Sequence, residues 1–152
     1  MKSSLAQLEQ FRDEIRLLTL KELEQRGFGH YGGSLSIVET LAVLYGEVMN
    51  YDPTNPTWDG RDYFILSKGH AGPALYAALS LKGFFPQEML YTLNANGTHL
   101  PSHPDRNLTP GIDMTTGSLG QGISVAAGVA LSHRLSNKDN YTYTIVGDGE
   151  LN

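Results

Sequence analysis

Hydrophobic residues recur every three or four positions over residues 8–18, with charged residues between them, which predicts an amphipathic helix. Ser4-Leu-Ala-Gln7 precedes this pattern and has the form of a capping box, in which the two side chains satisfy free backbone amides. Ser36-Ile-Val-Glu39 has the same form and predicts a second helix, whose apolar positions fall within residues 41–48. A third, short helix is expected over residues 86–93.

Two stretches have the β-branched and aromatic composition of strands. Tyr63-Phe-Ile-Leu66 predicts a buried strand, and a helix over residues 73–82 follows it after a glycine-containing turn. Residues 141–146 predict a second buried strand, preceded by a helix of small residues over 123–135. Strands separated by helices predict an α/β fold of three layers, a parallel sheet flanked by helices. Because two strands make a small sheet, we expect residues 1–152 to form a single domain that is truncated at its C-terminal end.

The glycine-rich connections carry most of the histidines. Residues 94–117 show little periodicity, and a connection of that length in a compact domain is expected to build a site. This segment contains His103, whereas His30 and His70 lie beside glycines in other turns. Imidazole can donate to phosphate or sugar oxygens, so we expect these three side chains to share a pocket. His133 lies within a predicted helix, between polar neighbours, and is expected to be solvated.

The clearest candidate for chemistry is Gly147-Asp-Gly149, directly after the second predicted strand. Open α/β sheets bind ligands at the C-terminal ends of their strands. The glycines allow an anionic group to approach the backbone, and the Asp148 carboxylate could hold a hard cation between phosphate oxygens. Asp-Gly is also a common turn dipeptide, so the motif alone supports a plain tight turn equally well. A Walker phosphate loop does not fit, because neither Lys68 nor Lys82 has the required glycine spacing.

Composition narrows the class of protein. The net charge of −5 and the lack of a basic run argue against a nucleic-acid partner. The absence of cysteine excludes a disulfide framework and fits a reducing cytoplasm. No apolar run approaches the length of a membrane span. We therefore expect a cytoplasmic globular protein without a membrane or nucleic-acid partner.

Five motifs together resemble, in the same order, the cofactor-binding half of transketolases, above all those divided into N-terminal and C-terminal polypeptides. The resemblance covers the chain from His30 to Asn152. The motifs are Gly29-His-Tyr-Gly-Gly-Ser-Leu-Ser36, Arg61-Asp-Tyr-Phe-Ile-Leu-Ser-Lys-Gly-His70, Pro101-Ser-His-Pro-Asp105, Thr115-Thr-Gly-Ser-Leu-Gly-Gln-Gly122 and Gly147-Asp-Gly149.

The resemblance implies thiamine diphosphate as cofactor, together with a divalent cation, usually magnesium (Mg²⁺). It implies that Asp148 is a metal ligand, that Gly149 lies against the diphosphate, and that His70 contacts the diphosphate side of the cofactor. The residues implied to line the pocket of the aminopyrimidine ring are Gly117, Ser118 and Leu119.

The implied reaction is transfer of a two-carbon ketol unit from a ketose phosphate to an aldose phosphate. The resemblance implies that His30 and His103 reach the sugar phosphate substrate and the reacting carbon, as hydrogen-bond donors that could also carry protons. The family's second metal ligand, an Asn beyond Asp148, and the glutamate that activates the aminopyrimidine have no counterpart here. We therefore expect a C-terminal transketolase subunit or domain as partner, a homo- or hetero-oligomer, and little activity from this chain alone.

Two alternatives remain open at the level of sequence. One is another thiamine diphosphate enzyme of similar build, such as a deoxyxylulose-phosphate synthase. The other is a catalytically inert cofactor-binding fragment. Ser67-Lys-Gly-His70 and Thr116-Gly-Ser-Leu-Gly-Gln-Gly122 favour transketolase, whereas Ser102 replaces a family glycine before His103.

Overall fold

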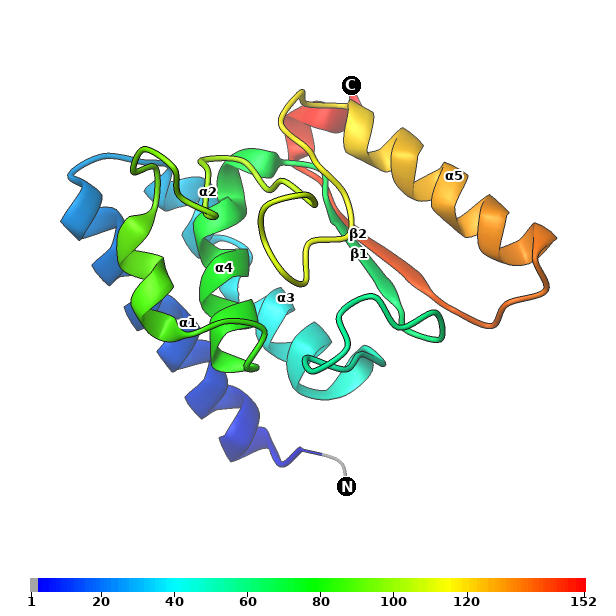
Figure 1. Ribbon diagram of the computed structural model, residues 1–152, viewed down its shortest axis with the longest axis horizontal. Helices are drawn as coiled ribbons and strands as arrows, with labels where there is room; N and C mark the ends of the chain where they lie inside the picture. Colours follow the sequence, from blue (N-terminus) through cyan, green and yellow to red (C-terminus); the bar gives the residue numbers. More distant parts are fainter. Residues whose placement is uncertain (1–2) are drawn as a thin grey trace.

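The computed structural model describes residues 3–152, and Figure 1 shows a small sheet with helices on both sides. The elements, in chain order, are α1 (Leu5–Arg26), α2 (Tyr31–Leu35), α3 (Val38–Val43), η1 (Leu44–Val48), β1 (Tyr63–Leu66), η2 (Gly69–Ala71), α4 (Gly72–Leu81), η3 (Gln87–Thr92), α5 (Gln121–Leu135), β2 (Thr142–Ile145) and η4 (Asp148–Leu151). Within residues 3–152, none of the helices combines the length and apolar character that a membrane crossing requires.

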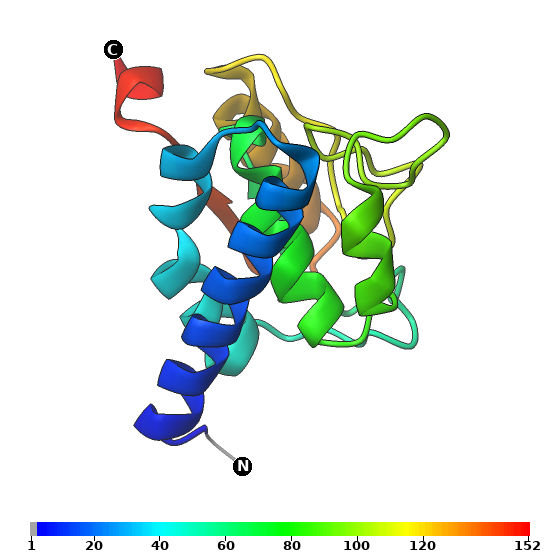
Figure 2. The same ribbon diagram turned by 90° about the vertical axis from the view of Figure 1, so that its left-hand side faces the viewer.

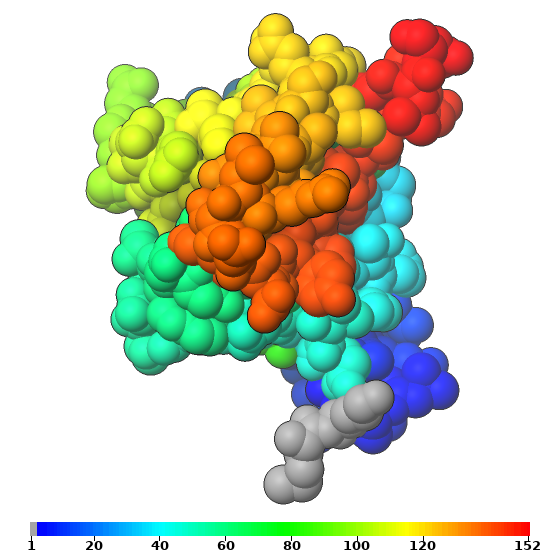
Figure 3. Space-filling view, turned by 90° about the vertical axis from the view of Figure 1, so that its right-hand side faces the viewer, coloured from blue at the N-terminus to red at the C-terminus, as the bar shows by residue number. Residues whose placement is uncertain are grey.

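The two strands form the middle layer. They pair in parallel, with Tyr63 beside Thr142 and Leu66 beside Ile145. Successive side chains of a strand point to opposite faces. Phe64 accordingly packs against the helices of one layer, whereas Tyr63 contacts α5 on the other face. Figure 3 shows α5 as the outer layer on that second face. The three-layer α/β fold expected from the sequence is confirmed.

Helix α4 forms the centre of the core. Nearly every residue from its start to Ser80 is buried, and Figure 2 shows α1 lying alongside it. Tyr76 and Leu79 of α4 and Ile15 of α1 are fully buried, and each such large side chain contributes about 1.5–3 kcal/mol through its transfer from water. This core fixes the position of β1, and with it the turns that follow the strand.

The predicted start of α1 is confirmed, but the predicted start of the second helix is wrong. Ser4 Oγ accepts from the Gln7 N–H, and the Gln7 side chain accepts from the Ser4 N–H. Ser36 instead ends the short helix α2, with no side-chain cap on α3. Its hydroxyl donates to the Gly33 carbonyl and accepts from the Lys68 ammonium group. Because this hydroxyl is engaged by another segment, it is not available as a helix cap.

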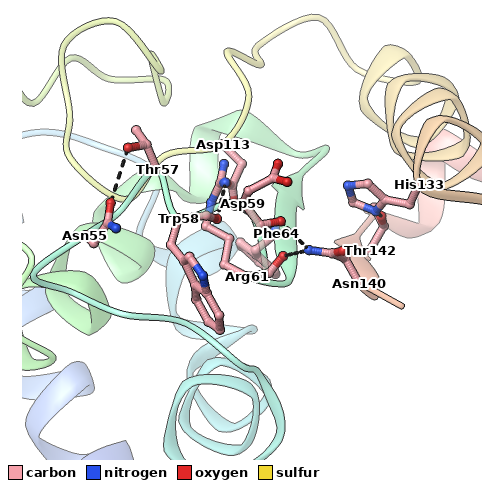
Figure 4. Close-up of polar contacts among 10 residues, drawn as sticks. All are labelled: Asn55, Thr57, Trp58, Asp59, Arg61, Phe64, Asp113, His133, Asn140 and Thr142. Atoms are coloured by element: carbon pink, nitrogen blue, oxygen red, sulfur yellow. Dashed lines mark hydrogen bonds and ion pairs between the residues drawn. The ribbon is translucent and has the colours of Figure 1, made fainter. Parts of the chain in front are cut away.

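His133 is also placed differently from the prediction. Its side chain is 7% exposed, and its ring packs edge-on against Tyr63 at a centroid distance of 4.8 Å. Its Nδ1 lies 3.4 Å from the Thr142 hydroxyl (Figure 4). His133 is buried because it lies on the face of α5 that covers the sheet. Strand β2, expected to be buried, is half-exposed, because β1 is its one strand neighbour among residues 3–152.

Candidate active site

Three histidines from separate segments converge beyond the C-terminal end of β1. His30 immediately precedes α2, His70 lies in η2, and the His30 and His70 rings meet edge-on at a centroid distance of 5.1 Å. His103 lies against Gly117, where an added Cβ would be 3.5 Å from its ring. The three imidazoles are close enough that His30 and His103 both act on the charge of His70. The structure therefore brings His30, His70, His103 and Gly117 together.

The surroundings of His70 favour its neutral form. Burial lowers the pKa of His70 below its usual value of 6.5, and the neighbouring side chains of His30, Lys68 and His103 lower it further. A neutral imidazole has one ring nitrogen that donates and one that accepts a hydrogen bond. At neutral pH, His70 can therefore donate to an anionic oxygen without being protonated beforehand.

Glycines allow the segments around these histidines to touch. A Cβ at Gly69 would lie 3.0 Å from the Gly117 nitrogen, and a Cβ at Gly122 only 2.5 Å from the Ser67 Cα. Real Cβ atoms essentially never approach as closely as at Gly122 and rarely as closely as at Gly69, so larger residues at either position would push the segments apart. The turn after β1, residues 115–118 and the first turn of α5 are thereby held side by side.

A cavity of about 310 Å³ opens beside this contact. It is lined by Thr115, Thr116, Gly117, Ser118, Gln121, Gly122 and Val125. Two of the residues expected at the aminopyrimidine, Gly117 and Ser118, are in this lining. Leu119 is outside it and is 59% exposed. The arrangement offers room for a planar ring next to the backbone of the 117–118 segment.

The Gly147-Asp-Gly149 turn lies at the same end of the sheet. Because β1 and β2 run parallel and in register, their C-terminal ends lie at the same edge of the sheet. Figures 1 and 2 show η4, which follows β2, at the end of the molecule that carries α2. Asp148 and Gly149 are exposed, and a Cβ at Gly149 would meet no atom within 4 Å. This open backbone and the nearby imidazole donors fit an anionic diphosphate group.

The fit to a metal ion is partial. Asp148 presents an exposed carboxylate, the type of ligand that a hard divalent cation prefers. No group of three or more His, Asp or Glu side chains that could enclose a cation occurs within residues 3–152. Asp148 can therefore contribute one ligand, and a complete site needs further ligands.

Two charged side chains that the sequence analysis missed connect the loops of the site. Lys68 donates to the Gly33 carbonyl at 3.0 Å and to the Ser36 hydroxyl at 2.8 Å, linking the end of β1 to α2. Burial lowers the pKa of Lys68, while the charges of Glu150 and Asp148 oppose that shift. The spacing of its partners along the chain gives no local signal for this role.

The second missed side chain is Glu150. It accepts hydrogen bonds from the Ser67 hydroxyl and from the backbone N–H groups of Gly120 and Gly147. Burial acts to raise the pKa of Glu150, but these three donors outweigh it, and the pKa lies below its usual value. Glu150 is therefore a carboxylate that is satisfied by the protein itself.

Comparison with known proteins agrees with this geometry. A family model described as the thiamine diphosphate binding domain of transketolase matches residues 8–152. The chain is 62% identical over 136 residues to the 6-deoxy-6-sulfo-D-fructose transketolase subunit SqwG of Clostridium sp. (strain MSTE9), covering 90% of this chain and 50% of that protein. It is 40% identical over 148 residues to the transketolase of Treponema pallidum (strain Nichols), covering 90% of this chain and 22% of that protein.

Solved structures give the same result. Transketolase from Leishmania mexicana matches with a TM-score of 0.90 and 34% identity, over 99% of this chain and 24% of that one. Transketolase from Campylobacter jejuni matches with a TM-score of 0.91 and 30% identity, over 98% of this chain and 24% of that one. The chain thus spans half the length of the Clostridium relative and under a quarter of these others. From the family match and the fold together, the chain belongs to the transketolase family and represents its thiamine diphosphate binding domain.

Proposed function

We propose that this chain supplies the diphosphate-binding part of an enzyme that transfers a two-carbon ketol unit from a ketose phosphate to an aldose phosphate. The observation that carries the proposal is the convergence of His30, His70 and His103 beside the turn containing Asp148, where two parallel strands end. The 62% identity to a transketolase subunit supports the same reaction class.

The proposed cofactor site is built from the glycine-rich turns. Asp148 would provide one ligand to Mg²⁺, and Gly149 would let the diphosphate approach the backbone. His70 would donate a hydrogen bond to the diphosphate, consistent with its neutral form at pH 7. The aminopyrimidine ring would lie against the segment formed by Gly117, Ser118 and Leu119. When bound, thiamine diphosphate supplies the electron sink for cleavage of a carbon–carbon bond.

The proposed substrate site uses the two exposed histidines of this cluster, His30 and His103. His30 and His103 would donate hydrogen bonds to the carbonyl and hydroxyl oxygens of the sugar, which stabilises charge that develops on oxygen. Either imidazole could also carry a proton, as histidine does in general acid–base catalysis. The protein's own tasks are therefore to bind and orient the sugar and to place protons at its oxygens.

We also propose that a second polypeptide or domain completes this site. The relatives are longer than the matched region. Among residues 3–152, no group of three or more side chains could hold a cation around Asp148, the one carboxylate proposed as a ligand. The resemblance places the further metal ligand, an Asn, beyond Asp148 along the same polypeptide. A C-terminal transketolase subunit or domain, in a homo- or hetero-oligomer, would supply the glutamate that activates the aminopyrimidine. We call the combination of the subunit at the full length of its relatives and that partner the assembled enzyme.

Product analysis of the assembled enzyme tests the reaction. With a ketose phosphate donor and an aldose phosphate acceptor, we expect two sugar phosphates whose chains have changed by two carbons. Because the Clostridium relative is named for 6-deoxy-6-sulfo-D-fructose, that sulfosugar should be offered as a second donor. Decarboxylation of pyruvate would instead indicate a deoxyxylulose-phosphate synthase. No product from any of these substrates, with cofactor bound, would indicate an inert cofactor-binding module.

Substitution of individual histidines separates their proposed roles. His70→Ala should weaken binding of thiamine diphosphate about 10–100-fold, because it removes a hydrogen bond to a charged group. His30→Ala should lower kcat about 100-fold or more while the cofactor stays bound, as expected for loss of a proton-transferring group. Cofactor titration and steady-state kinetics measure the two effects, with His99→Ala on the long loop as control. Equal loss of cofactor in the His70 and His30 variants would contradict these assignments.

A further inference from the structure

Glu150 links three separate segments through one carboxylate. Its Oε1 accepts from the Ser67 hydroxyl at 2.6 Å and from the Gly120 N–H at 2.8 Å. Its Oε2 accepts from the Gly147 N–H at 2.6 Å. Both oxygens are therefore occupied by protein donors, although Glu150 lies only two residues after Asp148. This occupancy distinguishes it from the exposed carboxylate of Asp148.

Each donor belongs to a segment that the proposed site uses. Ser67 directly follows β1, three residues before His70. Gly120 has a φ of 84° and directly follows the 117–119 segment at the start of α5. Gly147 directly precedes Asp148. A single side chain thus holds the turn bearing the proposed metal ligand against the end of β1 and the proposed ring pocket.

We propose that Glu150 is a positioning residue whose three hydrogen bonds fix the turn of Asp148 relative to the 117–119 segment before the cofactor binds. This inference rests on the proposed function for the identity of the cofactor. Such preorganisation strengthens binding because a loop that is already ordered loses less conformational freedom when the ligand arrives. Partners that orient a metal ligand typically change metal affinity about 10–100-fold when they are removed.

The direction in which the cofactor Kd changes distinguishes a positioning role of Glu150 from a purely electrostatic one. A carboxylate close to a diphosphate repels it, so removing the negative charge alone should tighten cofactor binding. Loss of positioning should weaken binding instead, because the three segments become free to move apart. The charges of Glu150 and Asp148 both act on the Lys68 ammonium group, and Lys68 is retained in every Glu150 variant.

The experiment compares Glu150→Ala and Glu150→Gln with wild type in the assembled enzyme, with the exposed Glu88→Gln as the control of equal charge. Calorimetry at fixed Mg²⁺ gives the Kd of thiamine diphosphate, and hydrogen exchange reports the amides of Gly120 and Gly147 without cofactor. For Glu150→Ala we expect a Kd about 10–100-fold higher, faster exchange at both amides, and a kcat close to wild type at saturating cofactor. Glu150→Gln retains one acceptor oxygen, so its Kd and its amide exchange rates should lie between those of wild type and of Glu150→Ala.

Unchanged or tighter cofactor binding in both Glu150 variants would overturn the proposal. An equal rise in Kd in Ile15→Val would also overturn it. Ile15 is a fully buried core residue of α1, so this variant measures the effect of general destabilisation alone. A wild-type enzyme that binds no thiamine diphosphate would instead overturn the proposed function. In that case, the amide exchange of the variants would still decide whether Glu150 holds the three segments together.

Discussion

Replacing Asp113 with alanine should lower the free energy of unfolding by about 3–5 kcal/mol. Asp113 is 8% exposed, and its Oδ1 accepts from Arg61 Nε at 3.0 Å and from Nη2 at 2.8 Å. Its Oδ2 accepts from the Phe64 N–H at 2.9 Å, on strand β1 (Figure 4). The substitution leaves a guanidinium group that is only 11% exposed, and a buried strand amide, without these partners.

Chemical denaturation followed by circular dichroism measures this loss. The exposed Asp139→Ala serves as the control and should change stability by less than about 0.5 kcal/mol. Asp113→Asn keeps an acceptor oxygen and should lose less than Asp113→Ala. Because Asp113 ties the segment of His103 and Gly117 to β1, exchange of amides within residues 94–117 should also accelerate. A loss below about 1 kcal/mol would show that this buried pair does not hold the long loop.

Replacing Glu22 with methionine should instead raise the free energy of unfolding, by about 1–3 kcal/mol. Glu22 lies in α1, is 1% exposed, and neither carboxylate oxygen has a hydrogen-bond partner within residues 3–152. Burial alone raises the pKa of Glu22 well above its usual value of 4.5. Methionine is unbranched, as glutamate is, so it can fill the space of the Glu22 side chain without introducing an unsatisfied polar group.

The pH dependence of stability follows from the sign of that shift. Below pH 4.5, Glu22 is protonated in both the folded and the unfolded chain. As pH rises toward the higher folded pKa, the unfolded chain releases its proton first, so this residue lowers stability progressively across that interval. Glu22→Met and Glu22→Gln should both remove this decline. Denaturation curves at several pH values measure it, with the exposed Glu24→Met as control. A destabilised Glu22→Met variant, or an unaltered pH profile, would contradict the assignment.

The parts of the fold that local patterns determine were predicted from the sequence. The capping box of Ser4, the strand at residues 63–66 and the helix after it depend on neighbours a few positions away. Ser36 broke the pattern because Lys68, 32 residues away, binds its hydroxyl. His133 was wrongly expected in solvent because its helix lies flat on the sheet, which no spacing within the helix reveals.

In the candidate site, too, local motifs were predicted from the sequence and long-range contacts were not. Its histidines and the Gly147-Asp-Gly149 turn were recognised from glycine-rich motifs, and the structure brings them to one end of the sheet. Lys68, Asp113 and Glu150 were not recognised as the side chains that hold these loops together. The partners of Asp113 and Glu150 lie up to 52 and 83 residues away along the chain, so their roles depend on tertiary contacts. Long-range hydrogen bonds of this kind leave no periodic signature.

Calorimetric titration of thiamine diphosphate with Mg²⁺ into the assembled enzyme tests whether Asp148 belongs to a cofactor-binding site. We expect saturable binding of one cofactor per site, which requires the cation and is weakened at least tenfold by Asp148→Ala. Glu88→Gln, far from the turn, should bind as wild type does. Binding that is unchanged by Asp148→Ala, or no binding at millimolar cofactor, would contradict the assignment of this pocket.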